Sequence, residues 1–104
     1  MPLLTDDERA HALCDLDGWT EQSSGKAIRR VFRCADFAQA FAFMTRIAPE
    51  AEKANHHPDW SNSWNRVDIR LTTHSVGGVT EKDVALAKVI DALARQLALP
   101  PSGD

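Results

Sequence analysis

Histidine and carboxylate side chains gather in one part of this sequence. His56 and His57 are adjacent, His74 and Asp83 follow them, and Glu52 precedes them. A free imidazole has a pKa of about 6.5, so near neutral pH it can both give and take a proton. Several imidazoles around one pocket therefore suit eliminations and hydrations that need no cofactor. The pattern predicts a site of acid–base catalysis.

Each of these residues also has a purely structural interpretation. Histidines in front of a proline can cap the last carbonyls of a helix, and His74 can end a strand in solvent. Asp83 can serve only to complete a helix capping box. Because the chain has only 4 histidines, three of them near a helix end and a strand end favour the chemical interpretation.

Metal binding is the main competing chemistry. Adjacent histidines, a later histidine and a carboxylate could supply tetrahedral ligands. However, neighbouring side chains point in different directions unless the backbone bends, and the H-E-x-x-H helical pair is absent. A nucleophile elbow, a P-loop and a dinucleotide fingerprint are absent as well. We therefore expect no metal and no cofactor.

Composition predicts one domain over residues 1–104, with a short tail at 100–104. The 104 residues are 43% hydrophobic and 26% charged, which suits a single ordinary core. The apolar runs are far shorter than the roughly 20 residues of a membrane span, and the amino terminus lacks a secretory pattern. A net charge of -3 argues against nucleic-acid binding. We expect a cytoplasmic protein with no membrane or nucleic-acid partner.

Capping signals predict all three helices, and at the second the capping pair is Asp36 with Gln39. Thr5 and Glu8 form a capping box, and Gly18 ends the helix that follows. A second box, from Thr80 to Asp83, opens the third helix.

The predicted second helix begins at Asp36 and ends at His57-Pro58, because the residue before a proline avoids the helical region. Pro49 lies inside it, so we expect a kink or a helix in two pieces. Apolar side chains at spacings of three and four predict its buried stripe, which comprises Phe37, Phe41, Met44, Ile47 or Ala48, and Ala51.

Four strands are predicted between the helices. They cover residues 19–22, 27–34, 60–64 and 66–74. In the last of these strands Val67, Ile69, Leu71 and Thr73 alternate with the residues expected on the other face. The short links favour antiparallel pairing, so we expect an α+β domain in the order α-β-β-α-β-β-α, with a four-stranded antiparallel sheet and helices packed on one face. The uncovered sheet face or edge would favour self-association.

The spacing of the chemically active residues resembles the signature of the pterin-4a-carbinolamine dehydratase family. The matched residues are Glu52-x-x-x-His56-His57-Pro58, then Trp64, His74 and Asp83. The chain length and the order of elements are also similar, so the resemblance covers essentially the whole chain. It implies a dehydratase that converts 4a-hydroxytetrahydrobiopterin to quinonoid dihydropterin and water, after an aromatic amino acid hydroxylase has produced the carbinolamine.

The resemblance also implies a role for each matched residue. His56 and His74 correspond to the acid–base pair, and His57 to a residue that binds and orients the pterin. Glu52 could hold an imidazole in place. The expected substrate-binding residues are Glu52, Trp60, Trp64 and Asp83, although both tryptophans could equally be core aromatics.

The partners implied by the resemblance are a reduced pterin and further copies of the chain, as a homodimer or homotetramer. A functional link to an aromatic amino acid hydroxylase, in tetrahydropterin recycling, is implied as well. Animal members of the family also act as dimerisation partners of a homeodomain transcription factor. A protein-interaction module of the same fold, acting as a transcriptional cofactor, is therefore the alternative function.

Overall fold

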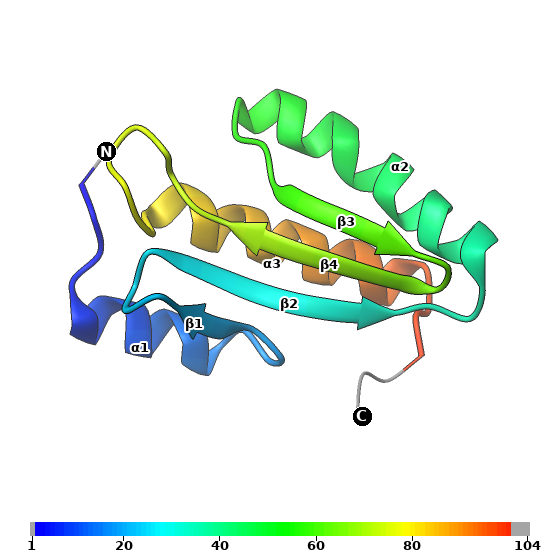
Figure 1. Cartoon of the computed structure of the whole chain (residues 1–104), viewed down its shortest axis with the longest axis horizontal. Coiled ribbons are helices and arrows are strands. Elements are labelled where there is room, and N and C mark those ends of the chain that lie inside the picture. Colours follow the sequence, from blue (N-terminus) through cyan, green and yellow to red (C-terminus); the bar gives the residue numbers. More distant parts are fainter. Residues whose placement is uncertain (1, 101–104) are drawn as a thin grey trace.

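The computed structural model describes residues 2–100 and confirms the predicted α+β fold (Figure 1). Its elements in chain order are α1 (Asp6–Cys14), β1 (Thr20–Gln22), β2 (Ala27–Arg33), α2 (Phe37–Ala54), β3 (Asp59–Ser63), β4 (Arg66–Leu71) and α3 (Glu81–Gln96). Apart from Pro100, the predicted tail lies outside the described residues. No helix among these residues has the length and apolar character that a membrane crossing needs.

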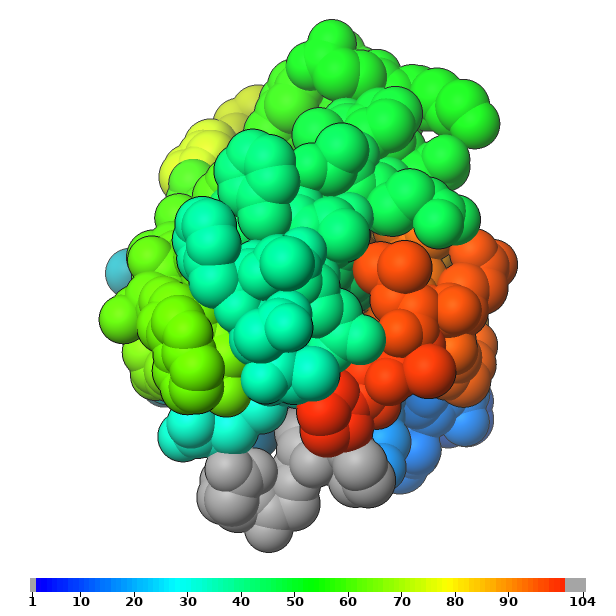
Figure 2. All heavy atoms as spheres, turned by 90° about the vertical axis from the view of Figure 1, so that its right-hand side faces the viewer, coloured from blue at the N-terminus to red at the C-terminus, as the bar shows by residue number. Residues whose placement is uncertain are grey.

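The four strands form one antiparallel sheet in the order β1-β2-β4-β3. In β4 the side chains of Val67, Ile69 and Leu71 are buried, while the residues between them lie on the opposite face. Figures 1 and 2 together show the helices on one side of the sheet, with α3 running behind β2 and β4. The predicted alternation along β4 and the helices on one face are thus confirmed.

The predicted capping interactions are present at all three helices. Thr5 caps α1 and Thr80 caps α3, each in a reciprocal capping box, and the Asp36 side chain accepts from the Gln39 amide at the start of α2. These contacts satisfy backbone donors that have no partner inside the helix. The positions where the helices begin were therefore predictable from local sequence.

Pro49 does not divide α2. The helix runs uninterrupted from Phe37 to Ala54, so the prediction of a helix in two pieces is wrong. Ile47 and Ala51, on either side of the proline, are fully packed in the core. Burial of this helix face outweighs the hydrogen bond that the proline removes.

The buried stripe of α2 differs from the predicted one. Ile47 and Ala51 are buried as expected, but Phe37 and Phe41 are 51% and 60% exposed. The stripe that faces the sheet and α3 consists of Ala40, Phe43, Ile47 and Ala51. The Phe43 ring meets Phe32 of β2 edge-on, with ring centroids 4.9 Å apart. Both stripes have helical spacing, so periodicity alone could not choose between them.

Phe43 and Phe41 provide a matched test of which face of α2 is buried. Phe43→Ala should lower the free energy of unfolding by about 3–5 kcal/mol, because it empties a filled core site. Phe41→Ala should cost less than about 1 kcal/mol, because its ring is mostly exposed. Urea unfolding at several protein concentrations measures both and separates any contribution from contacts between copies. Equal losses in the two variants would contradict the stripe described above.

Candidate active site

The end of α2 sets the two adjacent histidines in different directions. Asn55 adopts a left-handed conformation with φ of 50°, and the His56 amide donates to the Ala51 carbonyl over 3.1 Å. This Schellman-type bond ends the helix before His56 rather than at the His57-Pro58 step that the sequence predicted. His56 is consequently 8% exposed, whereas the His57 side chain remains largely exposed.

His56 is held by a carboxylate that is completely buried. Its Nε2 lies 2.5 Å from Oδ1 of Asp83, whose residue is 0% exposed. The other oxygen, Oδ2, accepts from the Thr73 hydroxyl and from the Thr80 amide, each over 2.8 Å. One side chain therefore connects the end of α2, the segment after β4 and the start of α3.

These contacts assign the proton on the His56 ring. A carboxylate oxygen accepts hydrogen bonds, so the Nε2–H of His56 donates to Asp83. The other ring nitrogen, Nδ1, is then the one that can exchange a proton with a bound molecule.

His74 lies in a tight turn rather than on a strand. β4 ends at Leu71, so the predicted strand end at residue 74 is wrong. Thr73 and Gly78 form an isolated bridge, and the Gly77 amide donates to the Thr73 carbonyl over 2.9 Å. The Nε2 atom of His74 lies 3.4 Å from Oδ2 of Asp59, the first residue of β3.

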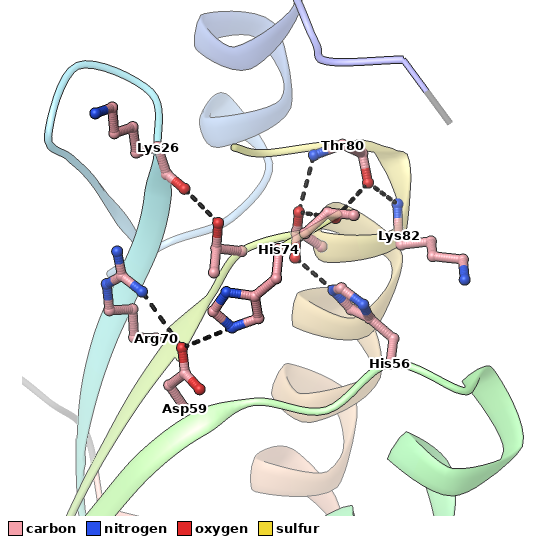
Figure 3. Close-up of polar contacts among 10 residues, drawn as sticks. Lys26, His56, Asp59, Arg70, His74, Thr80 and Lys82 are labelled. Carbon is pink, nitrogen blue, oxygen red and sulfur yellow. Dashed lines mark hydrogen bonds and ion pairs between the residues drawn. The ribbon is translucent and has the colours of Figure 1, made fainter. Parts of the chain in front are cut away.

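The three predicted catalytic histidines line one hollow of about 340 Å³. This volume lies at the lower end of the range for small-molecule sites. His56 and His74 reach it from separate segments, the end of α2 and the turn after β4 (Figure 3). The remaining lining residues are Asn55, Thr72, Thr73, Ser75 and Lys82.

The four predicted substrate-binding residues do not line this hollow. Asp83 lies buried behind His56, and Glu52 contacts Nε2 of His57 over 2.8 Å. Trp60 is half-buried against the core. Trp64 is 66% exposed in the turn that follows β3, roughly 15 Å along the strand from Asp59. Binding of a pterin by either tryptophan remains a prediction.

Sequence reasoning missed several polar residues of this region. Thr73 and Lys82 come to the hollow through the turn after β4 and the first turn of α3. Asn55 could have been suspected, since asparagine is the commonest residue after glycine in a left-handed helix terminus. Asp59 follows the histidine–proline tract directly, but its contact with His74 depends on the β3–β4 pairing, which no local motif encodes.

The described residues contain no arrangement of three or more histidine, cysteine, aspartate or glutamate side chains that could hold a metal ion. The carboxylates of this region instead contact the imidazole rings. Within residues 2–100, the geometry offers proton donors and acceptors around a small hollow.

Comparisons with known proteins place the chain in a family. The sequence profile described as "Pterin 4 alpha carbinolamine dehydratase" matches residues 2–93. The chain belongs to this family. A relative from Rhizorhabdus wittichii is 58% identical over 91 residues, which cover 88% of this chain and 94% of the relative. One from Burkholderia orbicola is 52% identical, covering 88% and 89%. Both carry the family's enzyme name provisionally.

Solved structures of the pterin dehydratase family share the fold. A Brucella melitensis protein described as a transcriptional coactivator/pterin dehydratase has a TM-score of 0.86 and 47% identity, over 89% of this chain and 99% of that one. A second structure has a TM-score of 0.65 and 28% identity, over 74% and 89%. It is described as a pterin dehydratase-like protein that is a RuBisCO assembly factor in the alpha-carboxysome.

The buried carboxylate predicts a clear contrast in stability. Asp83→Ala should lower the free energy of unfolding by about 2–4 kcal/mol, because it leaves the buried donors of His56, Thr73 and Thr80 without their acceptor. Glu52→Ala should change it by less than about 0.5 kcal/mol, because that carboxylate is on the surface. Urea denaturation of both variants tests this contrast. An Asp83 variant as stable as the wild type would show that the network does not hold the site together.

Proposed function

We propose that the chain dehydrates a 4a-hydroxytetrahydropterin, such as 4a-hydroxytetrahydrobiopterin, by histidine acid–base catalysis. The observation that carries the proposal is the convergence of His56, His57 and His74 on one hollow. Membership of the dehydratase family supports the substrate class. The product would be a quinonoid dihydropterin. A reductase can convert this product back to the tetrahydropterin that an aromatic amino acid hydroxylase consumes.

The reaction consists of two proton transfers and the loss of water. A protonated imidazole gives its proton to the C4a hydroxyl, and the C4a–O bond breaks to release water. A neutral imidazole takes the proton from N5, and the electron pair of the N5–H bond forms the C4a=N5 double bond. Protons and electrons balance within the substrate and the two imidazoles, so the proposed reaction needs neither a metal nor a redox cofactor.

We assign the acid–base pair to His56 and His74, and the orientation of the pterin to His57. The Nε2 atom of His56 is occupied by Asp83, and that of His74 lies against Asp59, so each ring has Nδ1 left for the substrate. Each positioned proton-transfer group should contribute roughly 10²- to 10⁴-fold to the rate. The cytoplasm is the compartment we expect for this activity.

Single histidine substitutions test the assignment. His74→Ala and His56→Ala should each lower the turnover rate tenfold or more, since each removes a proton-transfer group. His11→Ala is the matched control, because His11 belongs to α1 and does not line the hollow. Stopped-flow measurement with freshly generated carbinolamine gives the rates, and circular dichroism reports the fold. Full activity in both His56 and His74 variants would contradict the acid–base assignment.

We also propose that the chain forms a homodimer or homotetramer. Three large hydrophobic side chains are exposed near one end of the molecule: Phe37, Phe41 and Trp64. Figure 2 shows the first turns of α2 beside the turn between β3 and β4, both at the surface. An exposed apolar patch of this kind commonly marks a contact between proteins.

Light scattering coupled to gel filtration tests the assembly. The wild type should elute as a dimer or tetramer, and a Phe41→Ser, Trp64→Ser double variant should shift toward the monomer, because burial of the aromatic rings no longer drives association. Asp7→Ser, on α1, serves as a control for the added serine. A wild type that is monomeric at two protein concentrations 100-fold apart would rule out this part of the proposal.

The alternative is a protein-interaction module of the same fold that acts as a transcriptional cofactor. The exposed aromatic patch and the coactivator description of the Brucella melitensis relative support this alternative. A correctly folded wild type without dehydratase activity would favour this alternative over the enzyme.

A further inference from the structure

Each of the three imidazoles in the hollow contacts a different carboxylate, and always through Nε2. The pairs are His56–Asp83 at 2.5 Å, His57–Glu52 at 2.8 Å and His74–Asp59 at 3.4 Å. Glu52 and Asp83 belong to the sequence signature described above, whereas Asp59 does not. The family resemblance therefore assigns no role to the third carboxylate.

Asp59 stands between His74 and an arginine. It is the first residue of β3 and pairs directly with Arg70 of β4 in the sheet register. Its Oδ2 lies 3.3 Å from Nη1 of Arg70 and 3.4 Å from Nε2 of His74 (Figure 3). The carboxylate could have one of two roles. It could serve only to pair with Arg70 across the strands, or it could also orient the His74 imidazole.

His74 has a greater need of such a contact than His56 does. The His74 side chain is 73% exposed, so core packing does not hold its ring, whereas His56 is nearly buried. The backbone of the turn is anchored by the Thr73–Gly78 bridge, but this leaves the side-chain torsions of His74 free to rotate. A proton-transfer group must lie within hydrogen-bond reach of its target, so a freely rotating ring would lose rate.

We propose that Asp59 is the positioning residue for His74. Its carboxylate lies 3.4 Å from Nε2 and attracts that side of the ring, which favours one rotamer and leaves Nδ1 as the nitrogen that exchanges a proton in the hollow. The proposal rests on the proposed dehydratase function, because it assigns a role within that reaction. Asp59 itself is not expected to touch the substrate.

Steady-state kinetics separates the two explanations. Asp59→Ala should lower kcat roughly 3- to 10-fold with little change in KM, because the ring is misplaced while the hollow keeps its lining. Asp59→Glu should restore part of the loss. Arg70→Gln is the matched control: it removes the cross-strand ion pair, leaves the Asp59–His74 contact and should change kcat less than twofold. Equal losses in the Asp59→Ala and Arg70→Gln variants would overturn the proposal.

A double-mutant comparison tests whether Asp59 acts through His74. In a His74→Ala background, Asp59→Ala should have no further effect on kcat, because the side chain that it positions is gone. A further loss of the same size as in the wild-type background would show that Asp59 acts by another route, and the proposal would be wrong.

Nuclear magnetic resonance spectroscopy of the His74 ring gives a readout that does not depend on activity. The ring ¹⁵N and Hε1 resonances of His74 should move in Asp59→Ala and stay in place in Arg70→Gln. If the wild type shows no turnover, the proposed function fails, and these resonances alone then decide whether Asp59 orients His74. Resonances that are unchanged in Asp59→Ala would overturn the positioning role even in an active enzyme.

Discussion

The fully buried carboxylate of Asp83 is the interaction on which the rest of the site depends. It accepts from the amide of Thr80 at the start of α3, from the hydroxyl of Thr73 and from the ring of His56. A buried carboxylate is tolerated only when its oxygens have donors, and here three different segments supply them. The same contacts that cap α3 therefore also place His56 at the hollow. Stability and chemistry are coupled at this residue, because a change that frees the imidazole also removes the helix cap.

The histidines of the proposed acid–base pair differ in how they are held. His56 is nearly buried and makes a short contact with a fully buried carboxylate, whereas His74 lies in an exposed turn beside a half-exposed carboxylate. This asymmetry has a chemical consequence. The buried ring keeps a constant orientation, while the exposed ring can exchange its proton with solvent between turnovers. In the proposed reaction one imidazole loses a proton and the other gains one, so a proton must return from one ring to the other through the hollow or through solvent before the next turnover.

Local sequence signals predicted the parts of this fold that local interactions determine. Capping boxes at Thr5 and Thr80 and the alternation along β4 correspond directly to observed elements. The predictions were wrong where burial depends on contacts between segments that are far apart in the sequence. Two stripes on α2 have helical spacing, and packing in the core, including the contact with Phe32, decides that Phe43 rather than Phe41 is buried. For the site, the shared hollow of the three histidines was predicted from their clustering in the sequence and from the roles that the family resemblance implies. The contact between Asp59 and His74 was not, because it depends on how β3 pairs with β4.

The hollow and the exposed aromatic patch lie at opposite ends of α2. His56 and His57 follow its last turn, whereas Phe37 and Phe41 lie in its first turns, beside the turn that carries Trp64. A helix of 18 residues spans about 27 Å, so contacts at one end do not cover the other. Assembly through the aromatic patch would therefore leave the hollow open to a small molecule. Because of this separation, the aromatic patch can change while the hollow stays the same. The fold does not by itself determine the function. A structural neighbour at 28% identity, described as a RuBisCO assembly factor, shows that proteins of this fold do carry other roles.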